Sequence, residues 1–388
     1  MEKIFENTKV AFSLKSDLEL KKARFMFKVI ENPTLVKIGT WFTMAALRFR
    51  LPVKGLIKKT IFKQFCGGTN EKECIPIIEK LSEIGVTAIL DYSVEAKEEE
   101  ADFDAVMNKK ITLIDFAKKN EGVSFAVMKP TALGRFKIWQ KITEKKQLTS
   151  SEEAEWERIE KRFNRICSHA FQTGVPILID AEESWMQNAA DDLVERMMRL
   201  YNKKHTCIYN TIQCYRWDRL EYVKDLERKA RKDNFKIGVK IVRGAYMEKE
   251  NERAAEMHYK TPICESKKFT DRNFNEVLIY LMDRLDIFSV FVGSHNEPST
   301  YLTLELMNQK KLSRNHHNIW FGQLFGMSDQ ITYNLSKQGY NVAKLLPFGP
   351  VKEVIPYLIR RAEENTSVSG QTGRELKLLN QELERRKK

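Results

Sequence analysis

The chain has 388 residues, of which 42% are hydrophobic and 10% aromatic, and this composition excludes a wholly disordered protein because the apolar side chains can form a sizeable core. A formal net charge of +13 favours anionic partners such as acidic lipid, nucleic acid or a negatively charged cofactor, and it does not choose among them. No run of about 18 apolar residues occurs, which excludes a bilayer-spanning helix.

Residues 1–80 are predicted to form a helical extension, because they contain few glycines and place apolar residues at three-to-four spacing. The first residues, MEKIFENTKVAF, lack the apolar core of a signal peptide, so we expect a cytoplasmic protein. The most apolar segment, Ile38 to Leu47, is followed by basic residues. It either lies on an anionic membrane surface or packs beneath a barrel, and the sequence leaves both interpretations open.

Eight short apolar runs alternate with long amphipathic stretches after residue 80. The runs are Val86–Leu90, Val123–Met128, Val175–Ile179, Cys207–Ile212, Ile237–Val242, Ile287–Val292, Ile319–Phe321 and Val342–Leu346. The amphipathic stretches include Ala101–Lys119, Ser151–Thr173, Ala189–Lys203, Leu220–Asn234 and Asn273–Leu285. Continuous apolar runs are typical of parallel strands buried on both faces, so the pattern predicts a closed α/β barrel of the TIM type.

A doubly wound open sheet is the alternative architecture, but the chain has no GxGxxG or GxxxxGK[ST] motif. We therefore predict an N-terminal helical extension over residues 1–80, a barrel domain over 81–370 and a charged tail over 371–388. The tail from Arg374 is expected to be a solvated helix or a frayed end.

A barrel gathers its functional residues at the carboxyl ends of its strands. The polar residues at those ends are Asp91, Lys129, Asp180, Gln213, Arg243, Ser294, His295, Asn296 and Gln323. Each of them taken alone is more often a solvated loop residue, whereas their convergence indicates a site. Lys240 lies inside the fifth apolar run, where an unpaired charge is costly, so an anion should face it. Arg243 should lie just past the strand, and Gly244 and Ala245 would let the backbone approach a cofactor phosphate.

The predicted helix Val351–Asn365 has two distinct faces. Its apolar face comprises Val351, Val354, Ile355, Leu358 and Ala362, and its second face comprises Tyr357, Arg360, Arg361 and Glu364. The second face is compatible with an ordinary solvated surface. It is also compatible with a carboxylate clamp, because two guanidinium groups can hold a carboxylate bidentately.

Several segments together resemble the proline dehydrogenase family over roughly residues 85 to 370. They are LDYSVEA, MKPTALG, LIDAEESW, TIQCYRWD, VKIVRGAYMEKE, GSHNEP, FGQLFGMSDQ and LLPFGPVKEVIPYLIRRAEEN. The resemblance implies a distorted (βα)8 barrel that binds FAD non-covalently and oxidises L-proline to Δ1-pyrroline-5-carboxylate by hydride transfer to the flavin. It further implies a membrane quinone as electron acceptor and peripheral contact with the inner face of the membrane.

The resemblance also implies roles for individual residues. Asp180 and Lys240 would be catalytic, with Lys240 stabilising the negative charge of the reduced flavin. The substrate would contact Lys129, Arg360, Arg361, Tyr357, Leu345 and Tyr246, and Glu95 would pair with one of the arginines. FAD would contact Gln213, Lys240, Arg243, Gly244, Ala245, Ser294, His295, Asn296, Leu324 and Glu364. No metal site is expected.

Leu345 departs from the family pattern, because proline enzymes carry a tyrosine two residues before the PFG turn. The leucine leaves room for 4-hydroxyproline but offers no hydroxyl to its OH group, so proline is the predicted substrate and 4-hydroxyproline the alternative. A basic protein that binds RNA or lipid without catalysis is a second alternative. Its charges are not interleaved with aromatic stripes or RRM-like motifs, so no nucleic-acid partner is expected.

Overall fold

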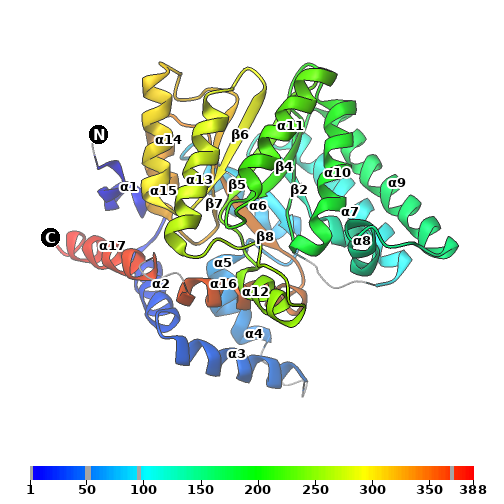
Figure 1. Ribbon diagram of the computed structural model, residues 1–388. Coiled ribbons are helices and arrows are strands. Elements are labelled where there is room, and N and C mark those ends of the chain that lie inside the picture. The colour runs from blue at the N-terminus through cyan, green and yellow to red at the C-terminus, as the bar shows by residue number, and fades with distance from the viewer. Residues whose placement is uncertain (1–2, 49–53, 94–97, 368–370) are drawn as a thin grey trace. The chain divides into compact units, whose positions relative to one another are not determined.

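Eight strands follow one another in chain order around a closed barrel in the computed structural model, which describes residues 3–48, 54–93, 98–367 and 371–388 (Figure 1). The strands are β1 (Thr87–Tyr92), β2 (Val123–Met128), β3 (Ile177–Ile179), β4 (Ile208–Gln213), β5 (Ile237–Val242), β6 (Phe288–Gly293), β7 (Ile319–Leu324) and β8 (Val342–Phe348). The predicted barrel is confirmed. Each predicted run coincides with a strand to within a few residues, the largest difference being three residues at the end of β7.

The chain divides into two compact units, 95–322 and 1–94 together with 323–388. The first unit holds β2 to β6 and most of β7 (Figure 1). Its helices are η3 (Pro130–Leu133), α7 (Glu100–Lys119), α8 (Phe136–Thr143), α9 (Ser150–Thr173), α10 (Ser184–Tyr201), α11 (Arg219–Asp233), α12 (Met247–Glu256), α13 (Lys267–Met282) and α14 (Glu297–Gln309). Helix α13 begins six residues before the predicted start because Ser266 caps it, accepting a hydrogen bond from the backbone N–H of Phe269.

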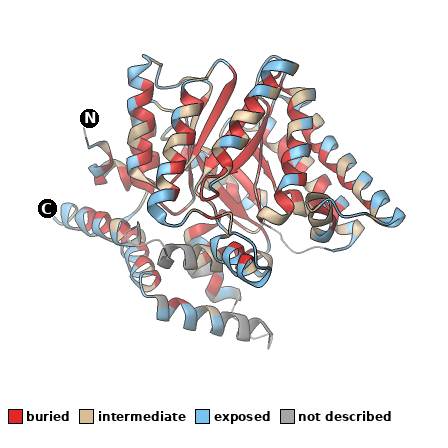
Figure 2. Ribbon diagram, in the orientation of Figure 1, coloured by how far each residue is buried: buried red, intermediate tan, exposed pale blue. Residues whose placement is uncertain are grey.

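The strands of this unit are buried along nearly their whole length (Figure 2). Inside the barrel the Phe125 ring is packed edge-on against three other rings, with centroid distances of 5.6 Å to Tyr209, 5.4 Å to Phe291 and 5.1 Å to Trp320. A Cβ atom on Gly322 would overlap the Phe291 ring, so β7 needs a glycine there. Apolar and aromatic packing therefore fills the barrel interior, as in other barrels of this class.

The second unit holds β1, β8 and the helices from both ends of the chain. These helices are η1 (Ile4–Glu6), α1 (Thr8–Ala11), α2 (Asp17–Ile30), α3 (Pro33–Arg48), α4 (Lys54–Ile57), η2 (Lys58–Phe62), α5 (Lys63–Phe65), α6 (Glu71–Ser82), α15 (Asp329–Lys337), α16 (Val351–Ser367) and α17 (Gln371–Arg385). The predicted helical character of the first 80 residues is confirmed for the part of that segment that the structure describes. None of the described helices is long and apolar enough to cross a membrane.

The C-terminal tail differs from the expectation of a solvated or frayed segment. Helix α17 buries Leu378 and Leu379 in a core with Leu20 and Phe27 of α2. Within the helix, Arg385 forms an ion pair with Glu382 at 2.8 Å. The high proportion of charged residues predicted a solvated helix, whereas the apolar residues on one side of the helix pack in the core.

Four ionisable side chains from distant parts of the second unit meet in its interior. Lys344 of β8 is completely buried and lies 2.9 Å from the Asp329 carboxylate, whose other oxygen lies 2.6 Å from Lys15. Glu375 of α17 accepts a hydrogen bond from the backbone N–H of Ser328. Burial raises the pKa of Asp329, but Lys15 and Lys344 outweigh it and hold that pKa at about 2. We call these residues the buried charge cluster.

Candidate active site

Three charged side chains from β2, β3 and β5 meet in the unit 95–322, two of them at the carboxyl ends of their strands. Asp180 directly follows β3, Lys129 directly follows β2, and Lys240 lies within β5. One oxygen of Asp180 is 2.5 Å from the Lys240 ammonium, and the other is 3.3 Å from that of Lys129. We call these three residues the charged triad. The structure thus brings together three of the residues predicted for the site.

The triad satisfies the requirement that Lys240 should face an anion. Lys240 is 8% exposed, and the anion is Asp180. Burial raises the pKa of Asp180, but Lys240 and Lys129 outweigh it and bring that pKa down to about 2. Asp180 is therefore an anion at neutral pH, and it fixes the position of both ammonium groups.

Glu182 is a buried neighbour of the triad that was not among the predicted site residues. Its carboxylate accepts hydrogen bonds from the backbone N–H and the hydroxyl of Thr131, at 3.0 and 2.7 Å, and so ties the segment after β3 to the segment that carries Lys129. Its backbone carbonyl accepts a hydrogen bond from Gln213 at 2.7 Å. Burial raises the pKa of Glu182 to about 7. The sequence held a signal in the two glutamates of DAEESW, which follow the strand end at once.

The raised pKa of Glu182 predicts how stability changes with pH. The unfolded chain releases this proton near pH 4.5 and the folded chain near pH 7, so the contribution to stability is fully present below about pH 4.5 and is lost as the pH rises to about 7. A shift of this size corresponds to roughly 3 kcal/mol. Glu375, whose pKa burial also raises to about 7, titrates in the same window. Urea unfolding at both ends of the window should therefore show a smaller loss for Glu182→Gln than for the parent, and equal losses would contradict the assignment.

Arg243 lies just past β5, as predicted, and is held by polar groups of its own unit. Its guanidinium donates to Asp271 at 2.7 Å, to the Ser294 hydroxyl at 2.9 Å and to the Ser299 hydroxyl at 3.0 Å. It also lies over the Phe274 ring, 4.6 Å from its centroid. Arg243 therefore links the end of β5 to the segment after β6.

Gly244 lies against the Tyr215 ring. Its φ of +131° suits only glycine, and a Cβ atom there would approach the Tyr215 ring to 2.5 Å. The glycine thus accommodates the Tyr215 ring, and the approach of this backbone to a cofactor phosphate stays a prediction. The backbone N–H of the exposed Ala245 points to the Gln213 side-chain oxygen at 3.4 Å, so two further predicted residues lie close together.

The segment after β6 contains Ser294, His295 and Asn296. Ser294 accepts a hydrogen bond from the backbone N–H of Asn296 at 3.1 Å, and the Asn296 side chain caps α14 by accepting from Ser299 at 2.9 Å. His295 is half-buried. Asn296 therefore caps α14, and its contact with FAD stays a prediction. Tyr246, predicted to contact the substrate, is half-buried directly before α12, with the Lys249 ammonium 5.9 Å from its ring centroid.

The other predicted site residues belong to the unit formed by 1–94 and 323–388. Leu345 and Leu324 are half-buried, and the Leu345 carbonyl accepts a hydrogen bond from Phe325 at 2.8 Å. Arg360 and Arg361 are half-buried on α16. Glu95 and the side chain of Glu364 lie outside the described residues.

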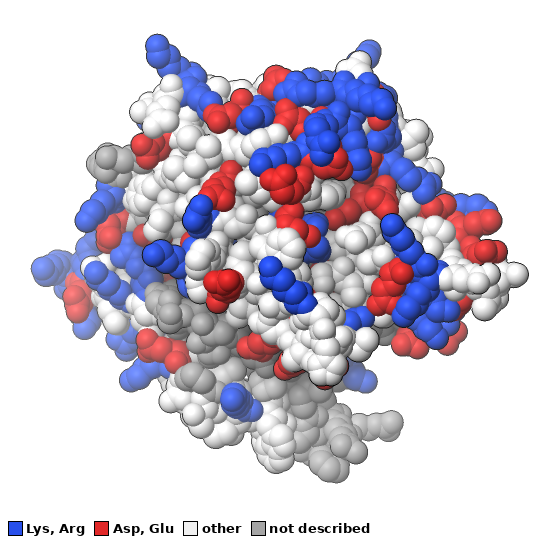
Figure 3. Space-filling view, viewed as in Figure 1, with Lys and Arg blue, Asp and Glu red and all other residues white. Residues whose placement is uncertain are grey.

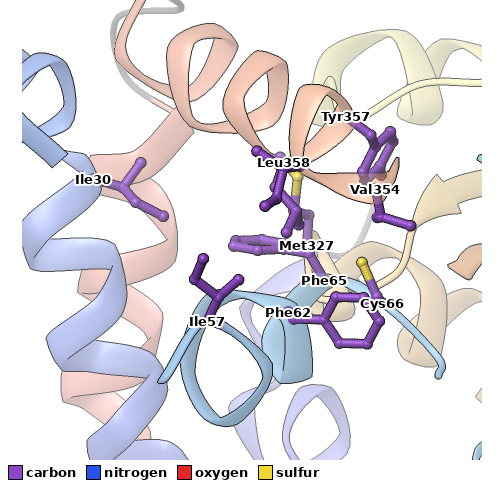
Figure 4. Packing of buried hydrophobic residues seen from close by; sticks show 10 residues of the cluster. Ile30, Ile57, Phe62, Phe65, Cys66, Met327, Val354, Tyr357 and Leu358 are labelled. Atoms are coloured by element: carbon purple, nitrogen blue, oxygen red, sulfur yellow. The ribbon is translucent and has the colours of Figure 1, made fainter. Parts of the chain in front are cut away.

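Tyr357 corrects the predicted division of α16 into two faces. It is 7% exposed and belongs to an apolar cluster with Val354, Leu358 and Met327, against which Leu324 packs (Figure 4). The Arg361 guanidinium lies over its ring at 5.4 Å. Helical spacing placed this tyrosine with the arginines, but an aromatic ring with one polar atom is stable in a core as well.

Comparison with known proteins identifies the family of this chain. The family described as "Proline dehydrogenase" matches residues 74–374. The chain is 36% identical to "Carbapenem antibiotics biosynthesis protein CarD" of Pectobacterium carotovorum subsp. carotovorum, over 83% of each protein. It is 34% identical to "Proline dehydrogenase 1, mitochondrial" of Dictyostelium discoideum, over 86% of this chain and 66% of that protein.

Among solved structures, a proline utilization A (PutA) protein from Bdellovibrio bacteriovorus superposes with a TM-score of 0.73 at 20% identity, over 97% of this chain and 39% of that one. At this identity the match shows the fold, and the chain spans about two fifths of the length of that protein. A family match over most of the chain agrees with the closed barrel and the charged triad, and the chain is an enzyme of the proline dehydrogenase family.

Proposed function

We propose that the protein is an FAD-dependent dehydrogenase that oxidises L-proline to Δ1-pyrroline-5-carboxylate, the first step of proline catabolism, and passes the electrons to a membrane quinone. The observation that carries the proposal is the charged triad, in which two ammonium groups and one carboxylate meet at the strand ends of a barrel of this family. The proposed location is the cytoplasm, in peripheral contact with the inner face of the membrane.

Two buried hydroxyl groups, one next to Lys240 and one on a ring that lies against Gly244, fit a bound flavin. The Thr211 hydroxyl and the Tyr215 hydroxyl are buried and have no hydrogen-bond partner among the described residues. Thr211 is the β4 neighbour of Lys240, and the Tyr215 ring lies against Gly244. Buried polar atoms are normally paired, so both hydroxyls suit a polar ligand. FAD, when bound, supplies the acceptor for the hydride that leaves proline.

In this proposal the residues of the protein bind and orient proline and the cofactor. Lys129, Arg360 and Arg361 would hold the proline carboxylate, Glu95 would pair with one of the arginines, and Leu345, Tyr357 and Tyr246 would contact the rest of the substrate. Lys240 would stabilise negative charge on the cofactor, and Asp180 would hold Lys240 in place. The remaining cofactor contacts would come from Gln213, Arg243, Gly244, Ala245, Ser294, His295, Asn296, Leu324 and Glu364.

Measuring the midpoint potential of bound flavin tests the role of Lys240. In Lys240→Ala we expect the potential to fall by about 30 mV or more, which corresponds to roughly 1.4 kcal/mol for a two-electron couple. The matched control is Lys310→Ala, which removes a surface ammonium paired with Asp283 and should leave the potential unchanged. An unchanged potential in Lys240→Ala would contradict the proposed role.

Purified protein separates the remaining alternatives. A yellow protein with flavin absorbance supports the enzyme, and a colourless protein that added FAD cannot restore would favour the non-enzymatic lipid or RNA binder. Steady-state kcat/KM on L-proline and on 4-hydroxyproline then tests the consequence of Leu345. We expect the higher value on proline, and a higher value on 4-hydroxyproline would reassign the substrate.

A further inference from the structure

Helix α3 exposes a row of large apolar side chains on one side. Leu35, Ile38, Trp41 and Phe42 recur at helical spacing and are 46%, 58%, 72% and 55% exposed. Val36, on the opposite side of the helix, is 8% exposed and faces inward. We call the four exposed residues the α3 apolar face. Most of the side-chain atoms that the described part of α3 presents in Figure 3 are uncharged.

Basic residues surround this face along the chain. Residues 20–65 contain eleven Lys or Arg residues and a single acidic residue, Glu31. On α2 the exposed Lys21, Lys22 and Lys28 share one side of the helix with Leu18 and Phe25, which are 61% and 69% exposed. Over the face of the other unit in Figure 3, by contrast, basic and acidic side chains are intermixed. Helices α2 and α3 thus combine exposed apolar side chains with mostly positive charge, and the acidic residues between residues 17 and 48 are Asp17, Glu19 and Glu31.

We propose that the α3 apolar face, with the lysines of α2, is the surface by which this protein docks on an anionic lipid bilayer. Tryptophan and phenylalanine are stable at the level of the lipid head groups, and lysines beside them are attracted to anionic lipid. A second copy of the chain fits less well, because two such basic surfaces repel each other. The inference rests on the proposed function for its purpose, since a membrane quinone is reached from the lipid surface.

Co-sedimentation of the full-length protein with lipid vesicles tests the proposal without any measurement of catalysis. The vesicles contain phosphatidylcholine alone, or phosphatidylcholine and phosphatidylglycerol in equal parts. We expect binding to the anionic vesicles only, weakening as salt is added. The double exchange Trp41→Ser with Phe42→Ser should weaken binding by about tenfold or more. The control is Phe269→Ser, which removes a 48% exposed aromatic side chain from α13 and should bind as the parent does.

A folding control and a second variant complete the lipid-binding experiment. Circular dichroism and flavin absorbance show whether each variant is folded, and the exchange Lys21→Gln with Lys22→Gln should reduce the salt dependence while leaving the apolar face intact. The proposal is overturned if the parent does not bind anionic vesicles or if the serine variant binds them equally well. It is also overturned if the serine exchange converts a dimer to a monomer without changing lipid binding, because a second copy would then cover the face. A protein that binds lipid but does not oxidise proline would contradict the proposed function alone.

Discussion

Replacing Asp180 with alanine is expected to lower the free energy of unfolding by about 3 to 5 kcal/mol, because it leaves two poorly exposed ammonium groups without their carboxylate. The side chains of Lys240 and Lys129 are only 11% and 19% exposed, so water cannot take the place of Asp180 fully. Activity on proline should fall by about a hundredfold, since a displaced Lys240 no longer faces the reacting groups correctly. Urea unfolding and steady-state kinetics measure the two effects.

A surface ion pair provides the matched control for Asp180. Asp283 pairs with Lys310 at 2.7 Å with side-chain exposures of 48% and 33%, and its replacement by alanine should cost no more than about 1 kcal/mol. Asp180→Asn keeps the size and one acceptor oxygen, so it separates charge from packing. If Asp180→Ala lowers the free energy of unfolding no more than Asp283→Ala does, pairing of the two ammonium groups with Asp180 does not stabilise the protein as expected.

The strands were predictable because parallel barrel strands are buried on both faces and therefore carry continuous apolar runs. That an anion faces Lys240 was also predictable, because a lysine inside a buried apolar run requires an anionic partner. The partner is Asp180, at the end of the next but one strand. Lys344 likewise lies inside an apolar run, Val342–Leu346, but the spacing of residues in the sequence does not identify its partners. Lys15 and Asp329 are 314 residues apart in sequence and meet only in the folded chain.

Side chains with mixed character mark a second limit of sequence patterns. Tyr357 has the spacing of the arginine face but packs in the core, and α17 is rich in charge but buries two leucines. In both cases the deciding partners, such as Met327 for Tyr357 and Leu20 for α17, come from other parts of the chain. Strand-end positions place Glu182 near the site, but only the fold shows that Thr131 holds its carboxylate.

The buried charge cluster predicts that its members differ in how strongly they affect stability. Asp329→Asn leaves the ammonium groups of Lys344 and Lys15, whose side chains are 0% and 19% exposed, without the carboxylate that both contact. We expect a loss of about 3 to 5 kcal/mol. Lys344→Met leaves the ion pair of Lys15 and Asp329, whose charges cancel. It removes the hydrogen bonds that Lys344 donates to the carbonyls of Met327 and Leu324. The expected loss of unfolding free energy is therefore smaller, roughly 1 to 3 kcal/mol.

Combining the two exchanges makes this prediction sharp. In the double variant the second exchange removes the fully buried charge that the first one leaves unpaired, so Asp329→Asn with Lys344→Met should be more stable than the sum of the two single losses implies. A coupling of about 1 to 3 kcal/mol, obtained by urea unfolding at neutral pH, is the expected outcome. Strict additivity would show that Lys344 and Asp329 stabilise the unit independently, and the buried charge cluster would then be a set of separate contacts that join the two ends of the chain to β8.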